Sequence, residues 1–149
     1  MTTDIVSTVE SWPGIVVEPH RFGGREFTLG GREVGHVHGT RQVDIPFPKR
    51  VRDVVVGEGF TSKHHLFPES GWVTKYLDSE ADTERAVWLL RIAYLSHVAA
   101  LQRRPSVDGA IASVDVAAEI DRMDLPGALR DLLSPDRPDS NGTATAAGR

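Results

Sequence analysis

Residues 30–39, which read Gly-Gly-Arg-Glu-Val-Gly-His-Val-His-Gly, decide how we interpret the rest of the chain. The paired glycines supply the positive φ angles of a two-residue hairpin turn, so we expect the residues after them to form a strand. Successive side chains of a strand point to opposite faces, and His36 and His38 therefore share one face, together with Val34. Two imidazoles directed to one place can bind a metal ion, or one of them can take a proton from a substrate near neutral pH. The alternative is a solvated pair of polar rings that performs no chemistry.

The composition is that of an ordinary globular protein. The chain has 149 residues, of which 40% are hydrophobic and 26% charged, and we expect one domain over residues 1–133 followed by a disordered tail at 134–149. A net charge of -4 argues against a nucleic-acid partner. No apolar run approaches the roughly 20 residues of a membrane-spanning helix, and residues 1–17 show no secretory signal. We therefore expect a cytoplasmic protein whose partner is a small molecule, with no membrane association.

Runs of alternating apolar residues separated by turns predict an antiparallel sheet of about five strands. These runs lie at residues 15–18, 25–29, 32–38, 42–45 and 72–77. A turn at residues 39–41 joins the histidine strand to the next strand as an antiparallel meander. This connection brings Asp44 near the two histidines.

Helical periodicity predicts a long helix that packs across one face of the sheet. It begins at Ser79 and ends at Gln102, with His97 at the edge of the core. Shorter helical patterns occupy residues 49–56, 114–123 and 126–133. The predicted fold class is α+β, with short additional helices towards the C-terminus.

The H-x-H pair can be compared with the metal-binding cupin barrel, in which a glycine precedes H-x-H by six positions. Gly30 stands six positions before His36. The acidic ligand expected shortly after the pair is missing, since positions 42 and 43 are Gln and Val, and the second cupin motif is also missing. Cupin-like dioxygenase chemistry is therefore kept only as an alternative. Zinc-protease, nucleotide-binding and serine-hydrolase motifs are absent from the sequence as well.

Three motifs occur in one order along the chain. They read Arg32-Glu33-Val34-x-His36-Val37-His38, Gly59-Phe60-x-x-Lys63-His64-x-Leu66 and Trp72-x-x-x-Tyr76, followed by a helix from Asp82. Together they resemble the luciferase-domain family, which includes bacterial luciferase-family proteins and the C-terminal region of fungal luciferase. The fungal counterparts read R-E-I-x-H-M-H, G-W-x-x-R-H-x-L and W-x-x-x-Y. The resemblance covers residues 31–95.

The resemblance implies an oxygenase activity. In the fungal reaction molecular oxygen is added to an enolic pyrone of the 3-hydroxyhispidin type, carbon dioxide is lost from a high-energy peroxide, and light is emitted. A related phenolic metabolite is the broader substrate class. The resemblance implies that molecular oxygen is a co-substrate. It also implies that neither flavin, ATP nor another cofactor is needed. The family motifs transfer most directly onto His36, His38 and His64, and then onto Arg32 and Glu33.

Such a reaction needs a base that removes the enol proton, because the resulting anion gives an electron to oxygen. A histidine with a pKa of about 6.5 suits this task at cellular pH. We expect His36 or His38 to be the base and the other to orient it or stabilise the oxyanion. We expect His64, from the loop at 60–71, to complete the pocket.

Six further residues are expected to contact the substrate. They are Arg32, Glu33, Asp44, Phe60, Trp72 and Tyr76. The three aromatic rings suit stacking on a flat substrate, and they equally suit a hydrophobic core. Glu33 points to the opposite face of an ideal strand, so a structural pair with Arg32 or Arg25 is as reasonable as a catalytic role.

Two other classes of function remain open at this point. His36, His38 and His64, with Asp44 as a further donor, suffice to bind Fe(II), Zn(II) or Mn(II) in a metal-dependent enzyme. The histidines can also hold a ligand without turnover, in a small-molecule binding module.

Overall fold

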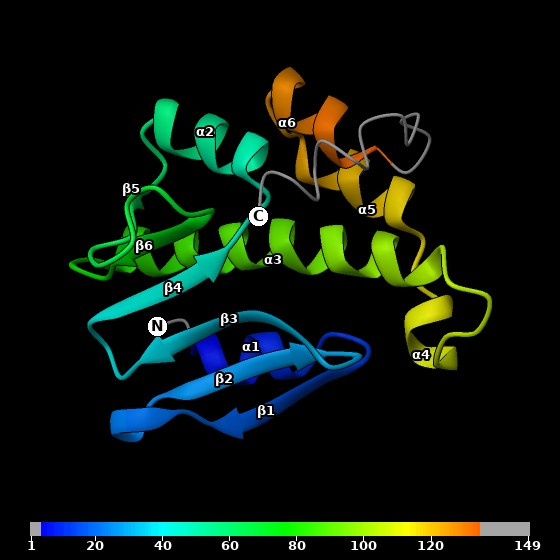
Figure 1. Cartoon of the computed structure of the whole chain (residues 1–149), viewed down its shortest axis with the longest axis horizontal. Coiled ribbons are helices and arrows are strands. Elements are labelled where there is room, and N and C mark those ends of the chain that lie inside the picture. Colours follow the sequence, from blue (N-terminus) through cyan, green and yellow to red (C-terminus); the bar gives the residue numbers. More distant parts are fainter. Residues whose placement is uncertain (1–3, 135–149) are drawn as a thin grey trace.

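The computed structural model describes residues 4–134, and the sheet that it contains is antiparallel throughout (Figure 1). Its six strands follow the order β1-β2-β3-β4-β6-β5. They are β1 (Ile15–Pro19), β2 (Arg25–Leu29), β3 (Arg32–His38), β4 (Gln42–Pro46), β5 (Ser62–Lys63) and β6 (Trp72–Tyr76). Apart from Ser134, the predicted disordered tail lies outside the described residues.

The α+β class and the five predicted strands are confirmed. The sixth strand, β5, has only two residues, which pair with β6 inside the segment predicted as a loop. A strand of two residues is too short to produce an alternating pattern, and this is why the sequence does not indicate it. Its pairing fixes the start of the loop that carries His64.

The helix α3 (Glu80–Gln102) covers one face of the sheet, as expected (Figure 1). It packs against β2, β3, β4 and β6. The hydroxyl of Ser79 caps it by accepting a hydrogen bond from the backbone N–H of Asp82 (3.1 Å). The other helices are α1 (Ile5–Glu10), α2 (Lys49–Gly57), α4 (Gly109–Ala112), α5 (Val116–Met123) and α6 (Gly127–Leu133). Within residues 4–134, no helix has both the length and the apolar character that crossing a membrane requires.

The strand β3 contains a β-bulge close to its glycine. Phe27 pairs with Gly35, whereas the next residue of β2, Thr28, pairs with Glu33, so that Val34 is an extra residue without an opposite partner. Val34 is fully buried in the hydrophobic core. The bulge therefore interrupts the alternation of side chains along β3.

Because of this interruption, the prediction for Val34 is wrong and the open question about Glu33 is answered. Val34 lies in the core and does not share a face with His36 and His38, so that prediction is wrong. Glu33, which an ideal strand would direct away from the histidines, instead contacts His36 through a 2.7 Å hydrogen bond. The extra residue at the bulge brings Glu33 to the histidine face.

Gly35 lies where β3 approaches both α3 and β4. A Cβ atom at this position would be 2.8 Å from Leu90 Cδ2 and 3.0 Å from the backbone oxygen of Asp44. We predict that Gly35→Ala destabilises the protein by roughly 1–3 kcal/mol, because the backbone of β4 must move to accommodate the methyl group. Chemical denaturation measures this loss.

A matched substitution separates crowding from the general effect of replacing glycine. A Cβ atom at Gly127, at the start of α6, would contact nothing within 4 Å. Gly127→Ala should leave the free energy of unfolding unchanged or raise it by up to about 1 kcal/mol. Equal unfolding midpoints for the Gly35→Ala variant and the wild type would show that the close approach of β3 to α3 and β4 is not rigid.

Candidate functional site

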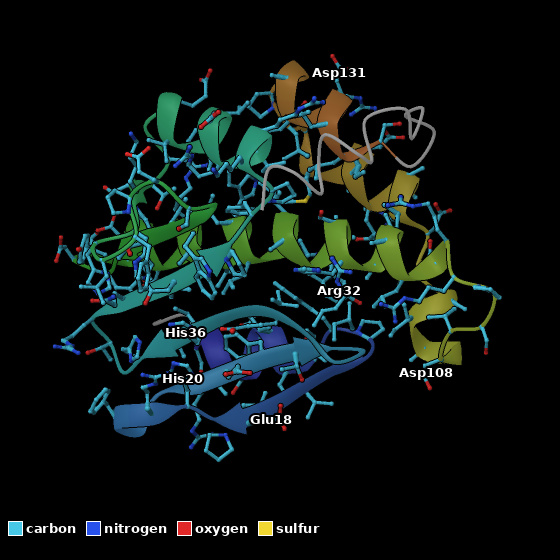
Figure 2. All side chains as sticks on the ribbon, viewed as in Figure 1. Glu18, His20, Arg32, His36, Asp108 and Asp131 are labelled. Carbon is cyan, nitrogen blue, oxygen red and sulfur yellow. The ribbon has the colours of Figure 1, made fainter. Side chains whose placement is uncertain are left out.

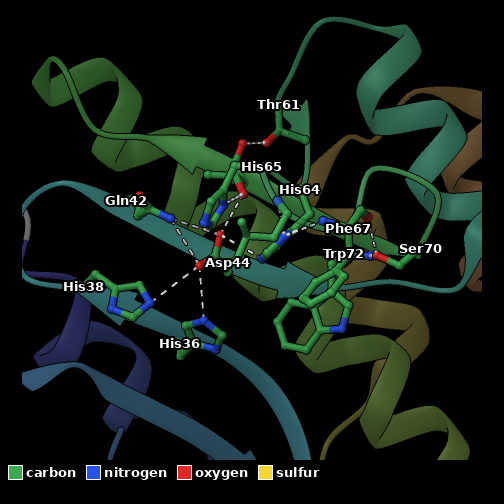
Figure 3. Close-up of polar contacts among 12 residues, drawn as sticks. His36, His38, Gln42, Asp44, Thr61, His64, His65, Phe67, Ser70 and Trp72 are labelled. Carbon is green, nitrogen blue, oxygen red and sulfur yellow. Dashed lines mark hydrogen bonds and ion pairs between the residues drawn. The ribbon is translucent and has the colours of Figure 1, made fainter. Parts of the chain in front are cut away.

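A row of polar residues crosses the sheet on the face opposite α3. Glu26, His36, Asp44 and Thr74 lie directly opposite one another on β2, β3, β4 and β6. Side chains at opposite positions of antiparallel strands are close enough to touch. Asp44 occupies the centre of the row with only 1% of its surface exposed (Figure 3).

The carboxylate of Asp44 accepts hydrogen bonds from three neighbouring side chains (Figure 3). His36 Nε2 donates to Oδ2 at 3.1 Å, Thr74 Oγ1 donates to Oδ1 at 2.7 Å, and Gln42 Nε2 reaches both oxygens at 3.3 and 3.2 Å. Burial alone would raise the pKa of Asp44, but the hydrogen bonds from His36 and Thr74 outweigh it and lower the pKa to about 2. Asp44 is therefore a fixed negative charge inside the protein.

His36 is held between two carboxylates. Its Nδ1 donates to Glu33 Oε2 at 2.7 Å and its Nε2 donates to Asp44 at 3.1 Å. Both ring nitrogens carry protons in this arrangement, because an ionised carboxylate can only accept. Burial works against the charged form, but the hydrogen bonds to Asp44 and Glu33 prevail and raise the pKa of His36 to about 9. The resulting stabilisation is complete below pH 6.5 and disappears as the pH rises through 9.

His38 lies beside this ion pair and stays neutral. Its Nε2 is 3.6 Å from Asp44 Oδ2, which is longer than a normal hydrogen bond. Burial and the positive charge of His36 lower the pKa of His38. Of the two histidines expected to act as a base, the geometry therefore favours His38, since His36 is already protonated.

His64 comes from the loop after β5 and has a defined tautomer. Its Nδ1 accepts hydrogen bonds from the backbone N–H groups of Leu66 (3.0 Å) and Phe67 (3.2 Å). The ring proton of neutral His64 therefore resides on Nε2, which lies 3.8 Å from Asp44 Oδ1. Burial lowers the pKa of His64, so the ring presents a neutral N–H donor to the site.

Trp72 forms an aromatic wall beside these rings. Its ring centroid is 5.3 Å from that of His36 and 6.0 Å from that of His64 (Figure 3). The structure thus brings together six of the predicted residues. They are Glu33, His36, His38, Asp44, His64 and Trp72.

Three predicted residues do not join this cluster. Arg32 lies beside α3 in Figure 2, where its Nε donates to His97 Nδ1 at 2.9 Å. Phe60 packs edge-to-face against Trp88 of α3, with ring centroids 5.0 Å apart. Tyr76 is 45% exposed and lines a neighbouring polar hollow of about 230 Å³. The contacts of Arg32 and Phe60 join the sheet side of the molecule to α3.

Two histidines that the sequence did not single out as site residues lie at the edges of the cluster. His20 stacks on His36 with ring centroids 4.1 Å apart, and its Nδ1 donates to Glu26 Oε1 at 3.0 Å (Figure 2). His65 is exposed, and its Nδ1 donates to Thr74 Oγ1 at 3.2 Å. A regular hairpin with its turn at residues 30–31 would place Glu26 opposite Gly35, and only the bulge at Val34 moves it opposite His36. The position of His20 depends on how β1 pairs with β2.

The site offers two groups of potential metal ligands among the described residues. One group is His20, His36 and His38, and the other is Asp44, His64 and His65. Within each group, one ligand atom from each residue lies within 4.8 Å of the others. Asp44 joins the two groups, since His36 and His38 approach one of its oxygens and His64 the other.

The family comparison covers most of this site. Residues 31–93 match the family model described as Luciferase domain. This segment is similar to the luciferase-domain family. The match confirms the resemblance expected from the three motifs, and it contains every predicted site residue. His20 and Glu26 lie outside the luciferase-domain match.

Two further comparisons, one with curated proteins and one with solved structures, found no match to the chain.

The protonation of His36 can be measured directly. We predict that in EDTA-treated protein the ring of His36 titrates with a midpoint near 9, whereas His38 and His64 titrate below the ordinary value of about 6.5. NMR spectra of the imidazole C–H groups over this pH range report each midpoint, and the His36→Gln variant identifies the His36 signal. A His36 midpoint near 6.5 would mean that the two carboxylates do not hold the ring.

Proposed function

We propose that this protein is a luciferase-like oxygenase that combines molecular oxygen with an enolic pyrone or a related phenolic metabolite. The observation that supports this most is the neutral imidazole of His38 beside the buried imidazolium of His36, within the segment that matches the luciferase domain. Conversion of an enol to its enolate needs a base, and a fixed positive charge stabilises the enolate that forms; this pair provides both.

The first step in this proposal is deprotonation of the substrate. His38 takes the proton of the enol hydroxyl on Nε2, and the electron pair of the O–H bond stays on the substrate as an enolate. His36 cannot take this proton, because both of its nitrogens already donate to carboxylates. The enolate is electron-rich and can pass one electron to molecular oxygen.

The negative charge of the enolate is then stabilised by groups that are already oriented. His36 supplies a positive charge held in place by Glu33 and Asp44. His64 supplies a neutral N–H donor whose direction is fixed by two backbone hydrogen bonds. Preorganised donors of this kind need little rearrangement as charge develops, which is why they lower a barrier effectively.

The later steps follow the chemistry that the luciferase-domain resemblance implies. Oxygen bonds to the substrate carbon, a high-energy peroxide forms, and carbon dioxide leaves, with or without emission of light. This sequence requires no cofactor. Trp72 is the substrate-binding residue best placed to contact a flat ring, because it lies against His36 and His64. A cytoplasmic location and a small-molecule partner complete the proposal.

An oxygen-electrode assay with 3-hydroxyhispidin and a panel of simpler pyrones and catechols tests this function. We predict oxygen uptake by the wild type and a loss of at least about 100-fold in kcat for His38→Gln, because proton transfer by a positioned base contributes that much. Luminescence recorded in parallel shows whether light accompanies turnover.

His65→Gln is the matched control, since His65 is an exposed histidine of the same neighbourhood whose contacts are with His64 and Thr74 and not with His36 or His38. Its activity should stay close to that of the wild type. Ligand binding without any oxygen uptake would identify a binding module, and equal activity of wild type and His38→Gln would remove His38 as the base.

A further inference from the structure

Two imidazole nitrogens approach one carboxylate oxygen closely enough that a small inward shift of His38 would let all three atoms bind one metal ion. His36 Nε2 and His38 Nε2 lie 3.1 Å and 3.6 Å from the same oxygen, Asp44 Oδ2. Ligands that each lie about 2.1 Å from one ion are separated from one another by roughly 3.0–3.4 Å. The two imidazole planes are nearly perpendicular, at 80°, and their ring centroids are 5.0 Å apart.

The groups behind these donors also fit a metal centre. A histidine that binds a metal usually donates its other N–H to a carboxylate, and His36 does so to Glu33 at 2.7 Å. Asp44 is oriented by Thr74 Oγ1 at 2.7 Å and by Gln42. Two histidines and one carboxylate are a common ligand set for divalent transition-metal ions with open coordination positions.

The neighbouring histidines fit less well as ligands. His64 Nδ1 accepts two backbone hydrogen bonds, so Nε2 carries the proton and has no lone pair to offer. The His20 ring stacks on His36 at an interplanar angle of 16°. Imidazole lone pairs lie in the ring plane, and two stacked rings cannot both direct theirs at one ion without moving. We therefore do not count His64, which the sequence had suggested as a ligand, among the ligands of this site.

We propose that His36, His38 and Asp44 bind one first-row divalent transition-metal ion, and that this ion inhibits the oxygenase. The ion takes the position of the proton between His36 and Asp44. It also occupies the lone pair with which His38 removes the substrate proton. Inhibition rests on the proposed function, whereas binding of the ion rests on the donor geometry alone.

Calorimetric titration of EDTA-treated full-length protein with Zn²⁺ tests the binding, and the visible absorption of bound Co²⁺ reports the ligand set. We predict one ion per chain for the wild type. His38→Gln and Asp44→Asn should each weaken binding at least tenfold, because each removes one of three ligands. His64→Gln and His20→Gln should retain binding within about threefold, and circular dichroism establishes that each variant is folded.

Each result decides the proposal. If the wild type binds Zn²⁺ no more tightly than His38→Gln does, the proposed site is wrong. If His64→Gln binds Zn²⁺ as weakly as His38→Gln does, the proposed ligand set is wrong. Oxygen uptake that stops with one equivalent of Zn²⁺ and returns with EDTA supports inhibition. Uptake that requires the ion would leave the metal site standing and overturn both the inhibition and the cofactor-free reaction.

Discussion

The buried carboxylate of Asp44 organises the polar face of the sheet. It accepts hydrogen bonds from His36, Thr74 and Gln42, which belong to β3, β6 and β4. A buried charge without such partners would be strongly destabilising, so these groups must be in place once the sheet forms. Among the residues that the structure describes, no buried side-chain nitrogen or oxygen lacks a hydrogen-bond partner. The site therefore depends on three strands that pack together, because their side chains satisfy its buried charge.

The β-bulge at Val34 lets one strand serve both the core and the site. Glu33 comes before the bulge and His36 and His38 come after it, and all three side chains lie on the same face of the sheet. Val34 and Gly35 face the helix α3. Without the extra residue the alternation would place Glu33 against the core, and His36 would lose its shortest hydrogen bond. The bulge therefore adds Glu33 to Asp44 as a partner of the His36 ring, and together they keep it protonated and leave His38 as the histidine that can accept a proton.

Much of this architecture could be predicted from the sequence, because regular elements have regular patterns. The α+β class, the long helix and the approach of Asp44 to the histidines follow from periodicity and from the short connections between strands. A bulge, in contrast, depends on packing between strands, and no pattern in residues 32–38 marks Val34 as the extra residue. His20 was missed because the pairing of β1 determines its position. Tautomers such as that of His64 depend on loop geometry that composition does not encode.

The same arrangement that stabilises an anion can also attract a cation, and the positions of the protons decide between them. With a proton between His36 and Asp44, the site presents an imidazolium and the N–H of His64 to a substrate oxyanion. With that proton removed, the same atoms become two imidazole lone pairs and a carboxylate, which are metal ligands. One proton thus separates a cofactor-free oxygenase from a metal centre. A family motif that contains H-x-H is compatible with both, so the proton between His36 and Asp44, rather than the motif itself, decides between the two chemistries.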